Sequence, residues 1–263
     1  MEVKLSSRLT RQKRSFDPHW LWGLIPLALA LLLLWPGVIF HRSLPDFEKI
    51  HDISERKAAF FEFLSPYIHA ANREILRDRS HLRAIEKRFQ LGPLNRRDRH
   101  WILDTAEAFG MELDPEADLS MEQLEELRLR LDIIPPSLAL AQAALESGWG
   151  TSRYAQQGNN LFGIWCYEPG CGIIPRRRPA GATYEVASYR SPRNSFLDYI
   201  WNLNSNTAYR QLWLLRQNLR QNGDPIEGVV LADGLMRYSE EGSTYIRKIK
   251  GVIQSNGLGR FDP

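Results

Sequence analysis

The stretch "SLALAQAALESGWGTSRYAQQGNNLFGIW", residues 137–165, decides the fold of this chain. Its first half is small and apolar, as in a helix packed inside a protein, and Glu146 interrupts it near the end. Pro136 suits the first turn of such a helix, and Ser147-Gly148 is a pair typical of helix ends. The sequence therefore predicts a buried helix that carries one acid at its C-terminal end.

The position of Glu146 has a chemical consequence. Unsatisfied carbonyls and the negative end of the helix dipole disfavour its charged form, and a neighbouring aromatic such as Trp149 would add desolvation. A carboxyl group that keeps its proton near neutral pH is what protonation of a glycosidic oxygen requires. From the local sequence pattern alone, an ordinary surface glutamate at a fraying helix end explains the stretch equally well.

The whole composition is that of a globular protein. The chain has 263 residues, of which 43% are hydrophobic and 25% charged, with a net charge of +3. It shows no zinc-finger spacing, RRM-type aromatic signature or long basic stripe, so we expect no nucleic-acid partner. Six scattered histidines support neither a metal site nor a Ser-His-Asp site, and we expect no cofactor.

One segment places the protein at a membrane. Residues 20–40, "WLWGLIPLALALLLLWPGVIF", are uncharged, and as a helix they would span about 30 Å, the thickness of a bilayer core. The preceding tail, residues 1–19, is rich in Lys and Arg. The positive-inside rule then predicts a single-pass inner-membrane anchor with a cytoplasmic N-terminus, and export of everything from about His41 onward.

The two cysteines agree with an exported domain. Cys166 and Cys171 enclose the short loop "YEPG", and no further metal ligands stand nearby. In an oxidising compartment, a pair five residues apart indicates a disulfide that closes a tight turn. Two free thiols are the alternative.

Helical periodicity dominates the region between the anchor and the stretch quoted above, residues 41–132. It predicts helices over 47–90, with Ser65-Pro66 as a point of kinking or splitting, and over 95–109. A third follows Asp118, where Ser120 and Gln123 have the capping-box pattern. This lead-in region would form a stalk, a partner surface or, as we favour, a lobe packed on the following domain.

The C-terminal domain, residues 133–263, is predicted to be mainly helical with a small β-lobe. Residues 173–189 carry β-branched and alternating residues around a Pro-Ala-Gly turn, which indicates a two-stranded hairpin. Helical periodicity returns after Ser191 and again near 226–236 and 243–254. The expected class is mainly α (α+β).

Four motifs together resemble a known family. "ALESGWGTS", "NNLFGI", "YRSPRNSFLDYIWNLNSNTAYRQL" and "RYSEEGSTYIRKIKGVI" are similar to segments of the bacterial cell-wall N-acetylglucosaminidases of the lysozyme superfamily, the flagellar-type and autolysin glucosaminidases. The resemblance covers about residues 133–255. The anchor, the helical lead-in and the cysteine pair resemble a membrane-anchored branch of that family, back to about residue 50. It implies a lysozyme-like helical domain with a small β-hairpin lobe.

The resemblance also assigns roles to residues. Glu146 matches the family's acid and would protonate the bond that follows N-acetylglucosamine. Tyr238 matches an active-site tyrosine, which would hold a water or stabilise the positively charged sugar of the transition state. The expected sugar-binding residues are Trp149, Asn160, Phe162, Tyr189 and Tyr245. For Trp149, packing in the core is at least as good an explanation.

The second catalytic carboxylate is where the sequence departs from the family. In relatives it lies on the first strand of the hairpin, but here that strand is "GIIPRRR" and has no acid. Glu185 on the second strand is the nearest substitute, with Glu168 in the cysteine loop a weaker one. If neither serves, the acetamido group would assist, or the reaction would run without added water, as in lytic transglycosylases.

These patterns together predict a membrane-anchored, periplasmic peptidoglycan hydrolase. It would be an endo-β-N-acetylglucosaminidase that cleaves β-1,4 bonds of cell-wall glycan strands, with Glu146 as general acid. The alternatives are a lytic transglycosylase and a non-catalytic wall-binding or assembly factor on a degenerate glycosidase fold.

Overall fold

The computed structural model of the chain describes residues 43–263, which lie within one compact unit. The cytoplasmic tail predicted at 1–19 and the membrane helix predicted at 20–40 lie outside the described residues. Within residues 43–263, no helix combines the length and the apolar character needed to cross a bilayer.

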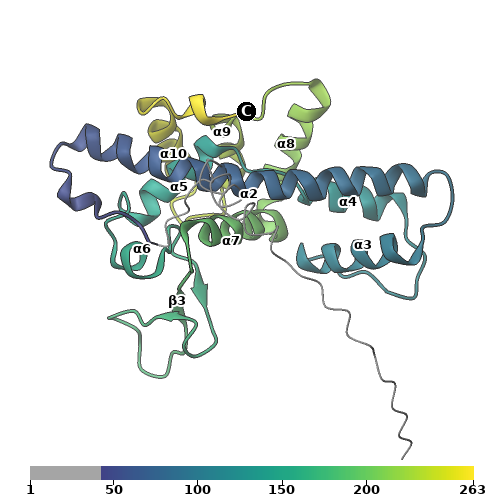
Figure 1. The fold of residues 1–263 in the computed structure, drawn as a ribbon, viewed down its shortest axis with the longest axis horizontal. Coiled ribbons are helices and arrows are strands. Elements are labelled where there is room, and N and C mark those ends of the chain that lie inside the picture. The colour runs from purple at the N-terminus through teal and green to yellow at the C-terminus, as the bar shows by residue number, and fades with distance from the viewer. Residues whose placement is uncertain (1–42) are drawn as a thin grey trace, which may run out of the picture. The chain divides into compact units, whose positions relative to one another are not determined.

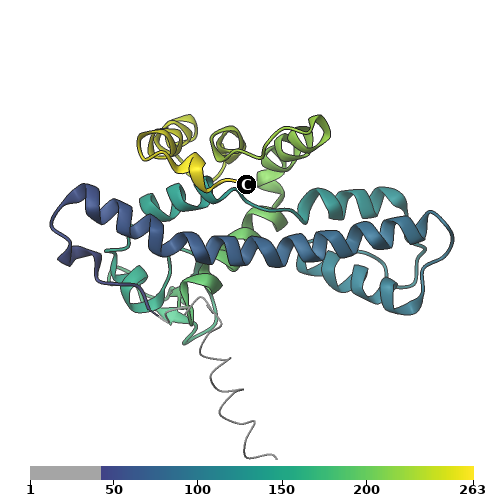
Figure 2. The ribbon, with the colours of Figure 1, turned by 45° about the horizontal axis from the view of Figure 1, so that its top comes forward.

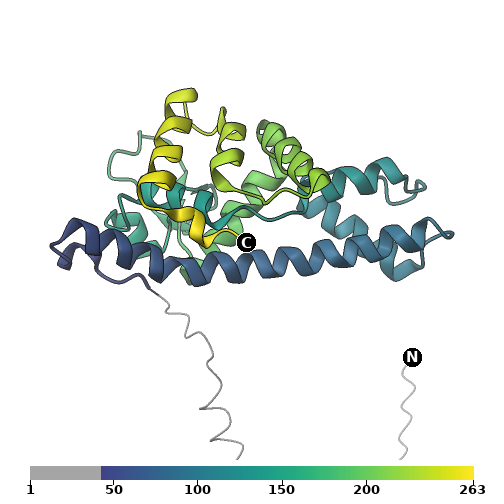
Figure 3. The ribbon, with the colours of Figure 1, turned by 90° about the horizontal axis from the view of Figure 1, so that it is seen from above.

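The lead-in region is built on one long helix, α2 (Ile53–Phe89). Asp52 caps it by accepting the backbone N–H of Glu55 at 2.8 Å. The helix runs through Pro66 without a break, so it is not split at Ser65-Pro66. Figures 1 to 3 show α3 and α4 beside its C-terminal half and α5, on which α10 packs, beside its N-terminal half. Because α2 packs on α5 and α7, the lead-in region and the following domain share one core.

Two shorter helices complete the lead-in region. Helix α3 spans Arg96–Ala108 and α4 spans Met121–Arg130, which confirms the helices predicted there. The predicted capping box is present in α4: the Ser120 hydroxyl accepts the backbone N–H of Gln123 at 3.3 Å, and the Gln123 side chain accepts the N–H of Ser120 at 2.9 Å. Local sequence signals are therefore sufficient to start this helix.

The apolar first half of the 137–165 stretch forms the central helix, α5 (Pro136–Ser147). Its residues from 136 to 144 are all buried, because α2, α9, α10 and the 3-10 turn η5 (Leu258–Phe261) surround it. Proline stands at the first helical position, and Gly148 ends the helix in the left-handed conformation, with a φ of 59°. The predicted start and end of the helix are confirmed.

The β-lobe follows the short helix α6 (Arg153–Gly158). Strands β1 (Trp165–Cys166), β2 (Gly172–Ile173) and β3 (Glu185–Ala187) form an antiparallel sheet in the order β1-β3-β2. The predicted hairpin corresponds to β2 and β3, but β3 is the central strand and pairs also with β1, which the prediction omitted. A two-residue strand is too short to show an alternating pattern.

Helices α7 (Pro192–Ser205), α8 (Arg210–Asn222), α9 (Gly228–Leu231) and α10 (Ser243–Ser255) complete the unit, with 3-10 turns η3 (Thr207–Tyr209) and η4 (Ala232–Leu235) between them. The helix predicted near 226–236 is thus α9 followed by η4. Here η4 lies directly on α8, since a Cβ on Gly234 would stand 2.4 Å from Leu212 Cα. The described fold is mainly helical with one small sheet, as predicted.

Candidate active site

The structure places Glu146 in the last turn of α5 and explains the Gly-Trp-Gly sequence that follows it. Residues Gly148, Trp149 and Gly150 all adopt positive φ, so the chain turns back tightly after the helix. The Ser147 hydroxyl fixes this turn, because it donates to the Ala143 carbonyl and accepts the N–H of Gly150 at 2.8 Å. The backbone on both sides of Glu146 is therefore held rigidly.

The same turn is anchored to the lead-in helix. A Cβ on Gly150 would stand 2.8 Å from the ring of Phe47, so only glycine fits there. The Trp149 ring packs edge-on against Phe60 and Phe61, with centroids 6.0 and 5.4 Å apart, and Lys57 Nζ lies 4.8 Å from its centroid. Trp149 thus packs against α2, in agreement with the alternative that it is a core residue.

A chain of hydrogen bonds ends on Glu146. Tyr199 donates its hydroxyl to Gln142 Oε1 at 2.6 Å, and Gln142 Nε2 donates to the Tyr245 hydroxyl at 3.0 Å. Tyr245 in turn donates to Glu146 Oε1 at 2.7 Å. Tyr245, predicted as a sugar-binding residue, therefore touches the acid itself. Each donor in the chain points towards Glu146, which orients one of its two oxygens.

Tyr238 belongs to the same cluster. Its ring stacks on that of Tyr245 with centroids 5.3 Å apart, and it lies 6.0 Å from that of Tyr209. Burial, followed by the nearby charge of Glu146, raises the pKa of Tyr238 well above its ordinary value. The phenol therefore stays protonated, and it can act by its O–H group but not as an anionic nucleophile. Glu146, Tyr238 and Tyr245, which the sequence separates widely, are brought together.

The pKa of Glu146 is raised. Desolvation by burial is the largest cause, the hydrogen bond from Tyr245 opposes it, and the charge of Glu241 adds to it. The residue as a whole is exposed, so solvent reaches one side of it, while protein atoms crowd the carboxyl group on the other. Burial on one side therefore favours the neutral form of the carboxyl group, while the other side is open to solvent.

Glu185 has a different environment. Its side chain is buried, and its two oxygens accept the backbone N–H groups of Gly170 at 3.1 Å and Gly172 at 2.8 Å. These bonds lower its pKa. The loop that it holds is also closed by the predicted disulfide between Cys166 and Cys171, whose Cα atoms are 6.2 Å apart. Glu185 thus bonds to the disulfide loop. The residues that shift the pKa of Glu146 are different ones, Tyr245 and Glu241.

The remaining predicted sugar-binding residues shape the backbone or pack in the core. Asn160 is buried and donates to the carbonyls of Ile164 and Ala187, both at 2.9 Å, which joins its loop to β3. Phe162 is also buried and stacks on Tyr199 at 4.0 Å, next to the hydrogen-bond chain. Tyr189 is half-buried and donates its hydroxyl to Asp198. Of these three residues, Phe162 contacts the hydrogen-bond chain that ends on Glu146, whereas Asn160 and Tyr189 bond to the β-lobe and to α7.

Sequence reasoning missed Gln142, Tyr199 and Glu241. Gln142 had a detectable signal, since it is a polar residue within an apolar helix and stands four positions before Glu146, on the same face. No local pattern marks Tyr199 or Glu241. Within residues 43–263, no group of three histidine, cysteine or acidic side chains is placed to hold a metal ion.

The chain is similar in sequence to known proteins. The model of the glucosaminidase family, described as mannosyl-glycoprotein endo-β-N-acetylglucosaminidase, matches residues 121–258. Protein bax of Escherichia coli is 31% identical over 214 residues, which cover 81% of this chain and 74% of that protein. Peptidoglycan hydrolase FlgJ of Vibrio parahaemolyticus is 32% identical over 155 residues. The match covers 54% of this chain and 46% of FlgJ.

One solved structure is also similar. The catalytic domain of the autolysin Auto from Listeria monocytogenes shares 20% identity, with 70% of this chain and 87% of that one covered and a TM-score of 0.34. The match to the glucosaminidase family model identifies the protein as a glycoside hydrolase. The chain belongs to the glucosaminidase family, as its motifs indicated, and its similarity to protein bax is consistent with the branch they resembled.

Proposed function

We propose that this protein is a membrane-anchored peptidoglycan hydrolase, an endo-β-N-acetylglucosaminidase that cleaves β-1,4 bonds of cell-wall glycan strands with Glu146 as general acid. The observation that carries the proposal is the environment of Glu146, which raises its pKa while one side stays open to solvent. Cell-wall glycan as substrate is supported by similarity to a peptidoglycan hydrolase.

The hydrogen-bond chain suggests how the proton is placed. Tyr245 donates to Glu146 Oε1, so that oxygen acts as an acceptor and the proton of the acid would reside on Oε2. Oε2 would give this proton to the glycosidic oxygen as the bond to the sugar breaks. The neutral phenol of Tyr238 would then hold the attacking water or stabilise the positive sugar ring. The second carboxylate remains a proposal for Glu185, although both of its oxygens already accept backbone N–H groups.

The compartment is part of the proposal. Residues 20–40 would anchor the chain in the inner membrane, with residues 1–19 in the cytoplasm and the enzyme domain in the periplasm. An oxidised Cys166–Cys171 pair fits that compartment. An anchor would confine cleavage to glycan near the membrane surface.

The substitution Glu146→Gln tests the assignment. The amide cannot donate a proton as an acid, so release of reducing ends from purified cell wall should fall by about 10² to 10⁴-fold, while the far-UV CD spectrum and Tm stay as in the parent. Glu227→Gln, which removes a carboxylate of an exposed residue elsewhere, is the matched control. Full activity of Glu146→Gln would refute the role of this acid.

Product analysis separates the alternatives. Mass spectrometry of the released fragments should show hydrolysed reducing ends, whereas a lytic transglycosylase would leave 1,6-anhydro ends. Binding of glycan without turnover, unchanged in Glu146→Gln, would instead identify a wall-binding protein.

A further inference from the structure

A second polar site lies at the opposite end of α5 from Glu146. It is a hollow of about 130 Å³ at the junction of α2, the end of α4 and α8. Asp132, which lines it, comes before the first residue of α5, whereas Glu146 lies in the last turn of that helix. Its lining is almost entirely basic or amide in character and consists of Arg79, Arg83, Arg128, Leu129, Asp132, Arg216, Gln217, Arg220 and Gln221.

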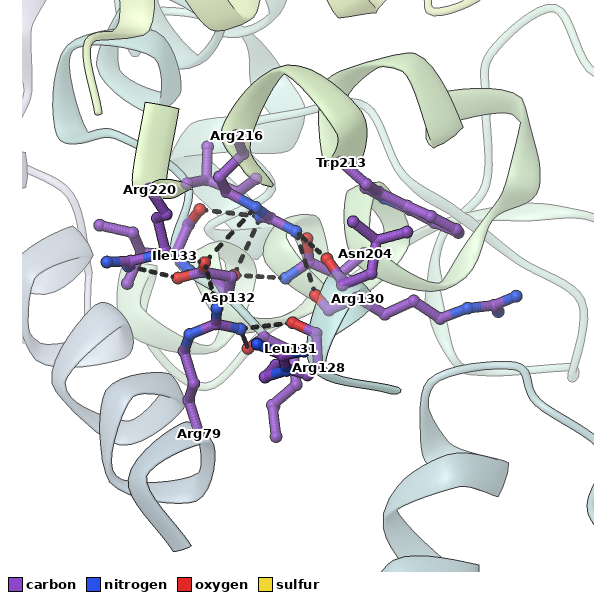
Figure 4. Close-up of polar contacts among 12 residues, drawn as sticks. Arg79, Arg128, Arg130, Leu131, Asp132, Ile133, Asn204, Trp213, Arg216 and Arg220 are labelled. Carbon is purple, nitrogen blue, oxygen red and sulfur yellow. Dashed lines mark hydrogen bonds and ion pairs between the residues drawn. The ribbon is translucent and has the colours of Figure 1, made fainter. Parts of the chain in front are cut away.

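Asp132 is the one carboxylate among these lining residues, and three guanidinium groups surround it (Figure 4). Arg220 binds it with two bonds, of 2.5 and 2.6 Å, and Arg79 lies 3.3 Å from its Oδ2. Arg216 is more distant, at 3.9 Å. Asp132 and Arg216 are almost completely buried, with 2% and 1% exposure.

Backbone carbonyls hold two of the arginines in place. Arg216 donates to the carbonyls of Leu129, Arg130, Asp132 and Ile133, and Arg79 donates to those of Arg128 and Leu131. These carbonyls belong to the C-terminal end of α4 and the segment after it, where the helix dipole is negative. The guanidinium groups are therefore ordered before any ligand arrives.

Positive charge at the hollow exceeds the negative charge available. Arg128 is matched by Glu86 at 3.0 Å, whereas Arg79, Arg216 and Arg220 share Asp132 and the partial charge of the α4 end. Arg83 adds a further positive charge at the rim. Burial lowers the pKa of Arg79 and Arg216 to about 10, so both remain protonated at neutral pH.

One donor at the hollow is left over. Arg79 Nε is buried and has no hydrogen-bond partner among residues 43–263, on a residue that is only 7% exposed. An unpaired buried donor is costly, and an acceptor oxygen of a ligand bound at the hollow would satisfy it.

We propose that this hollow is a binding site for a phosphate group. Guanidinium groups match phosphate oxygens in geometry and charge, and the amides of Gln217 and Gln221 supply further donors at the rim. The phosphate would lie among Arg79, Arg83 and Arg220. Its negative charge would neutralise the positive charge that Asp132 leaves uncompensated. This site is separate from the glycosidase site and does not depend on its assignment.

Thermal unfolding of the detergent-solubilised full chain tests the site. Inorganic phosphate at constant ionic strength, balanced with sodium chloride, should raise Tm in a saturable way, because a ligand bound only to the folded state stabilises it. Titration calorimetry with the same anion should give one site per chain. The absence of both signals would overturn the proposal and leave the arginines as caps of α4.

Arg83→Gln is the informative variant, because Arg83 is exposed at the rim and its loss spares the buried network. We expect phosphate affinity to fall about tenfold, as for the loss of one charge-assisted hydrogen bond. Lys87→Gln, an exposed cation one turn along α2, should bind phosphate as the parent does. Equal weakening in both variants would mean non-specific attraction and would contradict a built site.

Two further anions define the ligand. Diethyl phosphate imitates the diester of a lipid headgroup, and tighter binding than inorganic phosphate would point to a headgroup as the source. Tighter binding of inorganic phosphate would point to free phosphate or a monoester. Acetate that binds as tightly as either would overturn the phosphate class.

Discussion

Asp132 stands shortly before the start of α5 and Glu146 in its last turn, and both are crowded by protein, yet their pKa values move in opposite directions. Burial disfavours the charged form of each. At Asp132 the hydrogen bond from Arg220 and the charges of Arg216 and Arg79 outweigh burial, and the pKa is lowered. At Glu146 the hydrogen bond comes from a neutral phenol, and the pKa is raised.

The difference shows that partners, and not burial alone, decide whether a carboxyl group is structural or chemical. A carboxylate surrounded by guanidinium groups stays charged and joins helices together. A carboxyl group that meets only neutral donors and one distant negative charge keeps its proton, and can give it away. The segment before α5 thus carries an acid that arginines keep charged, and the last turn of α5 carries one whose neutral form is favoured.

The largest effect on stability is expected at Asp132. Asp132→Asn leaves buried arginines without their counter-charge, so the free energy of unfolding should fall by about 3–5 kcal/mol in urea titrations. Asp224→Asn, at an exposed position, should change it little. If Asp132→Asn left the free energy of unfolding unchanged, Asp132 would not stabilise the fold through its arginines, and the contrast with Glu146 would fail.

The pH dependence of stability checks the same point. Because the folded-state pKa of Asp132 is lowered from 3.8, its contribution is present above that unfolded value and is lost as the pH falls below it, towards the folded pKa. The parent should therefore lose stability below about pH 4 more steeply than Asp132→Asn, as measured by Tm against pH.

Glu185→Gln distinguishes a structural role of Glu185 in the disulfide loop from a role as catalytic base. The substitution replaces one of the two acceptor oxygens by an NH2 group, which cannot accept the backbone N–H that this oxygen binds in the parent. We expect a lower Tm with the turnover rate largely retained, since the residue holds the disulfide loop. A loss of turnover by about two orders of magnitude at unchanged Tm would instead establish Glu185 as the catalytic base.

Tyr245→Phe should have a moderate effect on catalysis. Loss of its hydrogen bond removes an interaction that favours the charged form of Glu146, so the pKa of the acid should rise and the alkaline limb of kcat/KM should move to higher pH. The rate at the optimum should fall by about tenfold, because Oε1 is no longer oriented. An unchanged pH profile would show that Tyr245 does not act on the acid.

The smallest effect is expected at Glu241. Its negative charge helps to raise the pKa of Glu146, so Glu241→Gln should move the alkaline limb slightly to lower pH. Its exposed ion pair with Lys248 contributes little to stability, and Tm should be almost unchanged. Glu240→Gln serves as the control, and an identical pH shift there would show that only the net surface charge matters.

Much of the fold could be predicted because its signals are local. The capping box at Ser120, the proline at the start of α5 and Gly148 at its end each act within a few residues, and helices formed where they indicated. Strand β1 was missed because its two residues pair with β3, about twenty positions later, and pairing at that distance leaves no local pattern.

The site was predictable only in part. Glu146 and Tyr238 followed from motif resemblance, and the structure brings them together through Tyr245. Glu185 was chosen because it lies on the expected strand, but position on a strand does not reveal that backbone amides occupy both of its oxygens. Gln142 was visible as a polar residue on an apolar face, without a partner to explain it.

By itself, the sequence determined where the central helix begins and ends and that one acid stands at its C-terminal end, because capping and periodicity depend on neighbours along the chain. Only the tertiary structure decided what each acid meets: a phenol for Glu146, arginines for Asp132 and amides for Glu185. Proton affinity depends on groups within a few ångströms in space, and folding brings those groups from distant parts of the chain.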